Sequence, residues 1–184
     1  MLELAYGRDL VMTGVIFGAA AFVWAGWGQE RPPRGVVWRV VLVVLQVAGL
    51  VLLGFGIPSA VRNWDTPTVL ASGSPALVWY IVVVWLEVIV MIVLAIFYAR
   101  TRRRHLIAPT VLIIVGLHFV PLAFVFGQSI ILLAAVLVTC AGVAALFLPR
   151  KVAAPSFWCA VLAAPVFLVF GVVVLVAGSR ALGG

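Results

Sequence analysis

Three polar side chains lie inside long apolar runs, where the cost of burying them makes them informative. Glu87 stands in the run VWLEV, His118 in GLHFV and Gln46 in VLQVA. A carboxylate at the centre of a membrane helix costs roughly 3 kcal/mol on insertion scales, so it normally faces a partner or water. A carboxylate and an imidazole that meet inside lipid can hold or pass a proton. These three residues are therefore the candidate site for a small solute or a proton.

The three candidates share one depth when the apolar runs are taken as helices. Each lies at or near the middle of its run, and a boundary error moves a side chain by only about 1.5 Å per residue. The runs of Gln46 and Glu87 are neighbours in sequence, as are those of Glu87 and His118, so we expect these helices to touch. The alternative is that these side chains only hold helices together, Glu87 as a neutral acid bound to Gln46 or to a carbonyl.

Two prolines at mid-run predict helix kinks. Pro121 follows His118 by three residues, and Pro165 interrupts the last run. Proline lacks the N–H group, and its ring displaces the carbonyl four residues earlier, which is that of Leu117 or of Val161 here. Broken helices at mid-depth line cavities in many transporters. We therefore expect Pro121 and Pro165 to open the helices around the site.

The composition places these helices in a membrane. Of the 184 residues, 66% are hydrophobic and only 9% are charged, against about 50% and about 25% in soluble domains. A spanning helix takes roughly 20 apolar residues, and a spanning β-barrel would need alternating segments in place of continuous runs. The sequence predicts an all-α protein with one domain, residues 1–184, forming a compact bundle of six transmembrane helices with short loops. The expected spans are 10–28, 36–56, 75–99, 106–126, 129–148 and 156–178.

The net charge of +7 is first an orientation signal, and no nucleic-acid partner is expected. Nine cations fall in the first, third and fifth connections, against three on the other side. They are Arg31, Arg34, Arg39, Arg100, Arg102, Arg103, Arg104, Arg150 and Lys151. This asymmetry predicts that both termini lie outside and the basic turns in the cytoplasm, with the protein in the cell (inner) membrane. The four arginines from residue 100 to residue 104 form one cluster that can contact anionic lipid.

Small residues predict where helices approach closely in lipid. Gly14 and Gly18 form a GxxxG motif, and the run 129–148 is rich in alanine. Packing rather than hydrophobicity holds membrane helices together, so such positions mark close contacts. We expect contacts within the chain, with contact between two copies as the alternative.

One connection is longer than the others. The segment 57–74 contains Arg62 and Asp65, which are close enough in sequence to pair, and we expect a plain connector there in preference to a gate or lid. Aromatic residues near the ends of the runs, among them Trp24 and Tyr80, predict interfacial belts with no role in recognition.

Ligand sets for metals and cofactors are incomplete in the sequence. Zinc takes three or four His, Cys or carboxylate ligands, and only Glu87 and His118 lie deep, with Cys140 as a possible third. The sequence has no Cys-x-x-Cys, His-Glu-x-x-His, nucleophile elbow or phosphate-binding loop. We therefore expect no metal and no cofactor, and enzyme activity is the less favoured interpretation.

Together these patterns favour a small transporter or channel-like protein that binds or moves a small solute or proton at Glu87, His118 and Gln46. The alternative is a non-catalytic accessory, sensor or lipid-interacting module whose buried polar residues serve helix packing. The expected partners are membrane lipids, a small solute or proton, and either further copies of the chain or a larger membrane complex.

Overall fold

A computed structural model describes residues 4–183, and six long helices account for most of them. Each of the six is long and apolar enough to cross a membrane. This confirms the prediction of an all-α, six-helix membrane bundle. The elements are α1 (Gly7–Gly28), α2 (Val36–Arg62), α3 (Pro75–Arg100), the short 3₁₀ helix η1 (Arg104–Leu106), α4 (Ile107–Val125), α5 (Ser129–Phe147) and α6 (Pro155–Gly183).

The start of α3 follows its sequence signal. The Ser74 hydroxyl oxygen accepts a hydrogen bond from the backbone N–H of Leu77 at 3.1 Å, and Pro75 occupies the first helical position. A serine cap satisfies one of the free N–H groups of the first turn, and proline has no N–H to satisfy.

The end of α2 differs from the predicted one. The helix passes through Pro58 and ends at Arg62, whereas the sequence suggested an end at Gly56. Proline removes one hydrogen bond, to the carbonyl of Gly54, and membrane helices tolerate such a loss. The longer helix leaves a shorter connection, residues 63–74, before α3.

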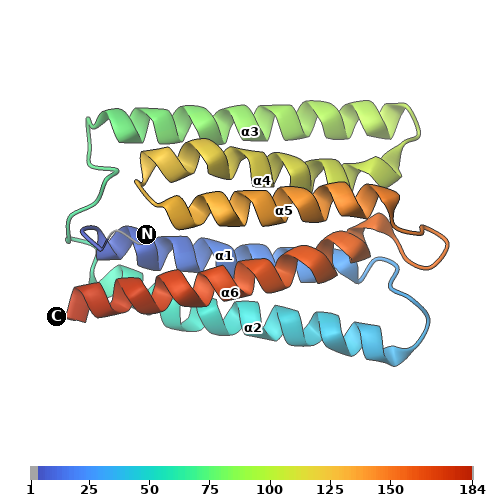
Figure 1. The fold of residues 1–184 in the computed structure, drawn as a ribbon, viewed down its shortest axis with the longest axis horizontal. Helices are drawn as coiled ribbons and strands as arrows, with labels where there is room; N and C mark the ends of the chain where they lie inside the picture. Colours follow the sequence, from blue (N-terminus) through green and yellow to red (C-terminus); the bar gives the residue numbers. More distant parts are fainter. Residues whose placement is uncertain (1–3, 184) are drawn as a thin grey trace.

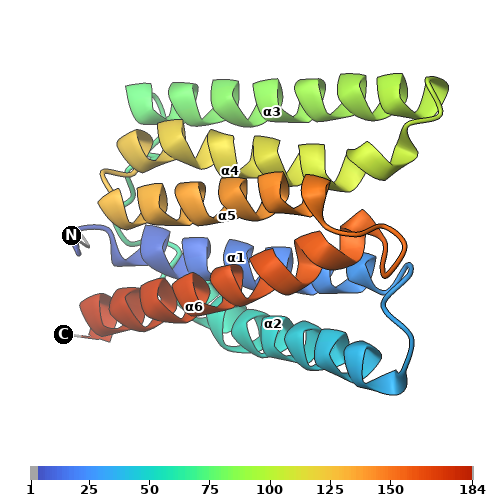
Figure 2. The same cartoon turned by 45° about the vertical axis from the view of Figure 1, so that its right-hand side comes forward.

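The six helices follow one order across the bundle (Figure 1). α3 lies at one edge, followed by α4 and α5, then by α1 and α6, with α2 at the opposite edge. A second view shows the same order (Figure 2). Both chain ends lie at one end of the bundle, which we call the terminal end. The turns after α1, α3 and α5 lie at the other end, which we call the basic end because it carries the nine clustered cations.

The expected contact between the second and third spans is wrong. α2 packs against α1 and α6, whereas α3 packs chiefly against α4. The segment 63–74 carries the chain across the terminal end from one edge of the bundle to the other (Figure 1). Small residues decide the neighbours of α2, because glycines such as Gly49 allow it to approach α1 closely.

Glycines also set the contacts of α1. A Cβ atom added at Gly14 would lie 2.9 Å from the Leu175 Cβ in α6, and one added at Gly18 would lie 2.8 Å from the Leu52 Cβ in α2. Carbon atoms pack at about 3.5–4.0 Å, so neither position has room for a side chain. The GxxxG motif therefore packs α1 against two helices of its own chain, which confirms the expected contacts within the chain.

The main core lies among α1, α4, α5 and α6. Phe17, Phe119 and Phe167 meet at its centre, with ring centroids 5.4 to 6.3 Å apart. Buried alanines of α5 and α6 surround the three rings. In contrast, none of residues 75–100, the whole of α3, is buried.

Hydrogen bonds tie two turns together at the basic end. The Arg31 carbonyl accepts from the Ala154 N–H at 2.8 Å, and the Arg31 guanidinium donates to the Arg150 carbonyl at 2.6 Å. The buried Ser156 hydroxyl donates to the Glu30 carboxylate at 2.7 Å. The ends of α1 and α5 are thereby joined to the start of α6.

The turn that follows α3 at the basic end contains an arginine in the left-handed conformation. The Arg103 N–H donates to the Tyr98 carbonyl at 2.8 Å, and the Arg102 N–H to the Ala99 carbonyl at 3.4 Å. This hydrogen-bond pattern ends many helices with a left-handed residue, which is usually glycine. Here the residue is Arg102, with φ of 58°.

Candidate functional site

Glu87 and His118 meet between α3 and α4. The Glu87 Oε1 atom lies 3.0 Å from the His118 Nδ1 atom, and the side chains are only 10% and 13% exposed. The expected contact between these two residues is confirmed. Both stand near the middle of helices that pack against each other, so each supplies the partner that the other needs at this depth.

The backbone of α4 fixes which nitrogen of His118 carries hydrogen. Nδ1 lies 2.7 Å from the Val115 carbonyl oxygen as well as 3.0 Å from Glu87. A carbonyl oxygen can only accept, so Nδ1 is the protonated nitrogen and donates toward both oxygens. The Glu87 carboxyl then acts as an acceptor, and His118 gains its charge through a proton on Nε2.

The second polar atom of each partner takes no part in the contact between them. Within residues 4–183 the contacts of His118 and Glu87 are made by Nδ1 and Oε1, and both side chains are slightly exposed. Each can therefore bind a water molecule, a proton or a ligand without breaking the contact between the two residues.

Glu87 and His118 both line a cavity of about 480 Å³. The cavity lies between α1 on one side and α3 and α4 on the other, and it runs from the terminal end to the depth of the pair. Its wall on α1 reaches from Arg8 to Ala20, which is about 18 Å at 1.5 Å per residue. The lining residues are Arg8, Asp9, Met12, Thr13, Ile16, Phe17, Ala20, Trp64, Thr68, Leu70, Tyr80, Val84, Glu87, Val115, His118, Phe119, Leu122, Phe126 and Ile131.

Aromatic rings form much of the cavity wall near the pair. The His118 ring lies 4.5 Å from that of Phe119, which in turn contacts Phe17. Tyr80 packs edge-on against Phe126 at 6.0 Å, nearer the terminal end. A ligand in the cavity would therefore meet ring faces and edges on several sides and polar atoms at its deep end.

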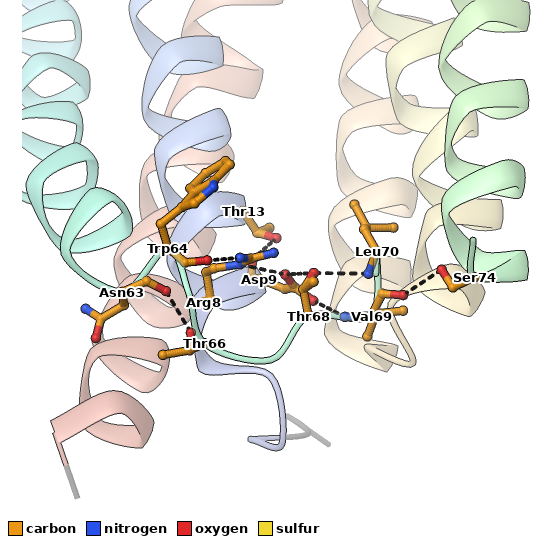
Figure 3. Close-up of polar contacts among 10 residues, drawn as sticks. All are labelled: Arg8, Asp9, Thr13, Asn63, Trp64, Thr66, Thr68, Val69, Leu70 and Ser74. Atoms are coloured by element: carbon orange, nitrogen blue, oxygen red, sulfur yellow. Dashed lines mark hydrogen bonds and ion pairs between the residues drawn. The ribbon is translucent and has the colours of Figure 1, made fainter. Parts of the chain in front are cut away.

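Asp9 binds the segment 63–74, which contributes to the cavity wall at the terminal end (Figure 3 shows the hydrogen bonds). Its carboxylate accepts a hydrogen bond from the Thr68 hydroxyl at 2.7 Å and another from the Val69 N–H at 2.8 Å. Thr68 and two other residues of this segment line the cavity. The segment is thus part of the site and is more than a connector.

Arg8 binds the same segment beside Asp9. Its guanidinium donates to the Trp64 carbonyl and lies 5.1 Å from the centre of the Trp64 ring. Its Nε atom is 3.9 Å from the Asp9 carboxylate. The predicted pairing of Arg62 with Asp65 does not occur within the described residues 4–183. At this end the charged residues that meet are Arg8 and Asp9, both in the first turn of α1.

Gln46 does not join the pair. It lies on α2, where its side-chain nitrogen would be 3.2 Å from a Cβ atom added at Gly26 of α1. It does not line the cavity, because α2 and α3 stand at opposite edges of the bundle. The predicted equal depth is also wrong: Gly26 stands nine residues, about 14 Å, nearer the basic end of α1 than Phe17, whose ring contacts Phe119 beside His118.

The prolines also lie away from the cavity. Pro121 lines a separate hollow between α3 and α4, together with Trp79 and Phe124. Pro165 is exposed on α6. Both helices continue through their prolines, since each loses only one hydrogen bond, so the expected opening of helices at the site is not seen.

Two further predictions are corrected by the side-chain positions. Tyr80 faces the cavity, and Trp24 is buried in the core beside Trp27, so neither is an interfacial anchor. The four arginines of the basic cluster are fully at the surface as expected. The polar mouth, Arg8 and Asp9, was missed as a site. Its signal was a pair of charges inside the first turn of an apolar helix.

Residues 77–181 match the family described as a family of unknown function, DUF6609. The match covers more than half of the chain. The protein belongs to DUF6609. The DUF6609 match begins in α3 and ends in α6, so it includes Glu87 and His118 but leaves out α1 and the segment 63–74. No curated protein and no solved structure matches the chain.

Proposed function

We propose that this protein is a small membrane transporter that binds a small solute or a proton at Glu87 and His118. The observation that supports this most strongly is the cavity of about 480 Å³ that ends at the pair. Residues that only hold helices together have no need of a cavity leading to them. Here both residues of the pair line the cavity.

The arrangement of the helices supports movement as well as binding. The lining residues reach from Arg8 and Asp9 at the terminal end to the depth of the pair. Passage to the basic end requires that the helices separate beyond this depth. We expect α3 to move, because it packs chiefly against α4 and none of its residues, 75–100, is buried.

The proposal is tested by proton flux into liposomes that contain the full chain and a trapped pH-sensitive dye. A potassium diffusion potential drives the protons. We expect Glu87→Gln to reduce the flux to that of protein-free liposomes, because an amide cannot take up and release the proton. Asp65→Asn removes an exposed carboxylate outside the cavity and should leave the flux as in the wild type. A folded Glu87→Gln variant with wild-type flux would contradict the proposal.

A second candidate, an accessory module within a larger complex or oligomer, is favoured by one observation. Trp79 and Trp85 on α3 are 62% and 63% exposed, and Trp85 stands near the middle of the span. Tryptophan prefers the membrane interface to the bilayer centre, so its place at mid-depth favours a protein neighbour there. Native mass measurement of the complex extracted in mild detergent tests this. A single chain with bound lipid alone would exclude the accessory role.

For orientation, we propose that the basic end faces the cytoplasm and both termini lie outside, in the cell membrane. The support is that all nine clustered cations lie at one end of the bundle. There the arginines from 100 to 104 are exposed and can contact anionic headgroups. The cavity would then open to the outside.

A further inference from the structure

The geometry points to an organic monocation as the solute: an ammonium ion with an aromatic or aliphatic body, bound with its charge at Glu87 in exchange for one proton. This inference rests on the proposed function and names the class of its substrate. Three features of the cavity support this inference: the charged groups that line it, the aromatic rings in its wall and the small number of possible metal ligands.

Among the described residues that line the cavity, Glu87 is the one acidic side chain at the deep end, and no arginine or lysine lies beside it there. The charged or ionisable side chains in its wall are Arg8 and Asp9 from α1, Tyr80 and Glu87 from α3, and His118 from α4. The residues contributed by α5 and by the segment 63–74 carry no charge. Arg8 and Asp9 lie together at the mouth, where their charges offset each other. Two hydrogen bonds further stabilise the Asp9 carboxylate. The deep end then holds one carboxyl group, that of Glu87, beside the imidazole of His118.

A carboxylate in apolar surroundings favours the uptake of one positive charge. A proton on the pair supplies that charge when the cavity is empty. A monocation beside Glu87 Oε2 supplies it equally, and the proton then leaves the pair. An anion gains nothing at this site, because it would need both Glu87 and His118 to be protonated at once.

The walls suit a cation with an organic body. The rings of Phe17, Phe119, Tyr80 and Phe126 line the cavity, and aromatic faces attract ammonium groups. The volume of about 480 Å³ falls within the about 300–1,000 Å³ of small-molecule sites. Within residues 4–183 no three His, Cys, Asp or Glu side chains are grouped, so a divalent metal would find only two ligands here.

The test uses two probes of the same shape that differ only in charge. Benzyltrimethylammonium is an aromatic quaternary ammonium ion, and neopentylbenzene is its uncharged carbon analogue. Binding of each to the detergent-purified full chain is measured by calorimetry, with micelles alone as the baseline. We expect the cation to bind at least about tenfold more tightly than the neutral probe. Because a quaternary ammonium ion carries no exchangeable proton, protons released into weakly buffered solution come from the protein.

Variants and pH complete the experiment. Glu87→Gln should weaken binding of the cation by at least about tenfold and abolish proton release, while leaving the neutral probe unaffected. Asp65→Asn is the matched control and should bind as the wild type does. For the wild type alone, the affinity for the cation should fall as the pH is lowered and protons occupy the pair. This pH series keeps the test valid if Glu87→Gln does not fold.

Three results would overturn the inference: equal affinity for the two probes, unchanged affinity for the cation in folded Glu87→Gln, or an affinity that does not vary with pH. These results leave the proposed function intact as long as Glu87→Gln still abolishes proton flux. If flux and cation binding are both insensitive to Glu87, the two proposals fail together.

Discussion

α6 and α3 are almost equally apolar and similar in length, yet the other helices bury α6 far more than α3. Of the 29 residues of α6, 13 are buried, whereas none of the 26 residues of α3 is. α6 is rich in alanine and glycine on the faces that meet α1 and α5, whereas α3 consists mainly of valine, isoleucine and leucine. In lipid, hydrophobicity gives no preference for one helix neighbour over another, so small residues decide which helices approach.

The cavity is a consequence of this difference. α1 contacts α6 and α2 through glycines, whereas α3 has no glycine and packs chiefly against α4. The space between them is the cavity, and the Glu87–His118 pair closes its deep end. The tightly packed helices give the bundle its stability, and the loosely packed helix α3 contributes Glu87 to the pair, opposite His118 on α4.

The largest expected effect comes from emptying the tight region. Phe167→Ala in α6 removes a fully buried ring from the centre of the core and should lower the free energy of unfolding by about 3–5 kcal/mol. Phe97→Ala is the matched change on α3, where the ring is 51% exposed, and should alter stability by less than about 0.5 kcal/mol. Unfolding in mixed micelles measures both. Similar losses in the two variants would contradict the contrast.

The next largest effect tests the glycine contacts. A Cβ atom at Gly116 would lie 2.3 Å from the Thr139 Oγ1 atom and 2.6 Å from the Thr139 backbone nitrogen. Gly116→Ala should therefore force α4 and α5 apart and cost about 1–3 kcal/mol. Gly54→Ala places its methyl group in open space and should be neutral or stabilising by up to about 1 kcal/mol. Thermal midpoints in detergent compare the two, and equal midpoints would show that close approach is unimportant.

A smaller effect is expected at the mouth of the cavity. Asp9→Ala removes both hydrogen bonds to the segment 63–74 and should cost about 1–2 kcal/mol. It should also raise amide hydrogen exchange at Val69, whose N–H loses its acceptor. Asp65→Ala, with the same change on an exposed residue, should do neither. Unaltered exchange at Val69 in the Asp9 variant would show that the segment is held by other contacts.

The smallest effect concerns the pair itself. In a double-mutant cycle of Glu87→Leu and His118→Leu we expect a coupling of about 0.6 kcal/mol, the average for polar contacts between membrane helices. The cavity beside the pair allows hydration, which weakens the contact. A coupling above about 2 kcal/mol would identify the pair as a major structural contact and would weaken the case for a site that exchanges protons.

Several parts of the fold could be predicted because single residues carry their signals. Ser74 and Pro75 mark the start of α3, and the apolar runs give six spans within a few residues of those observed, except where α2 and α6 extend further. The contact of Glu87 with His118 could also be expected, since a charged group at mid-depth needs a partner and α4 directly follows α3.

What could not be predicted was the direction of side chains around each helix axis. These helices are apolar on every face, so periodicity does not reveal which face is buried. The prediction for Gln46 is therefore wrong in its neighbours and in its depth, because Gln46 lies beside Gly26 near the basic end of α1. For the same reason Tyr80 was taken as a belt residue, although it lines the cavity. The role of Asp9 depends on a segment almost 60 residues away, and no local pattern indicates that contact.

The left-handed Arg102 has a consequence for the surface of the membrane. An L-residue with a side chain pays about 1 kcal/mol for a backbone conformation that glycine adopts freely. The chain nevertheless has an arginine at this position, followed by two more, Arg103 and Arg104. The strained turn therefore keeps one more positive charge at the membrane surface. Arg102→Gly would relieve the backbone strain and weaken the attraction to acidic phospholipid.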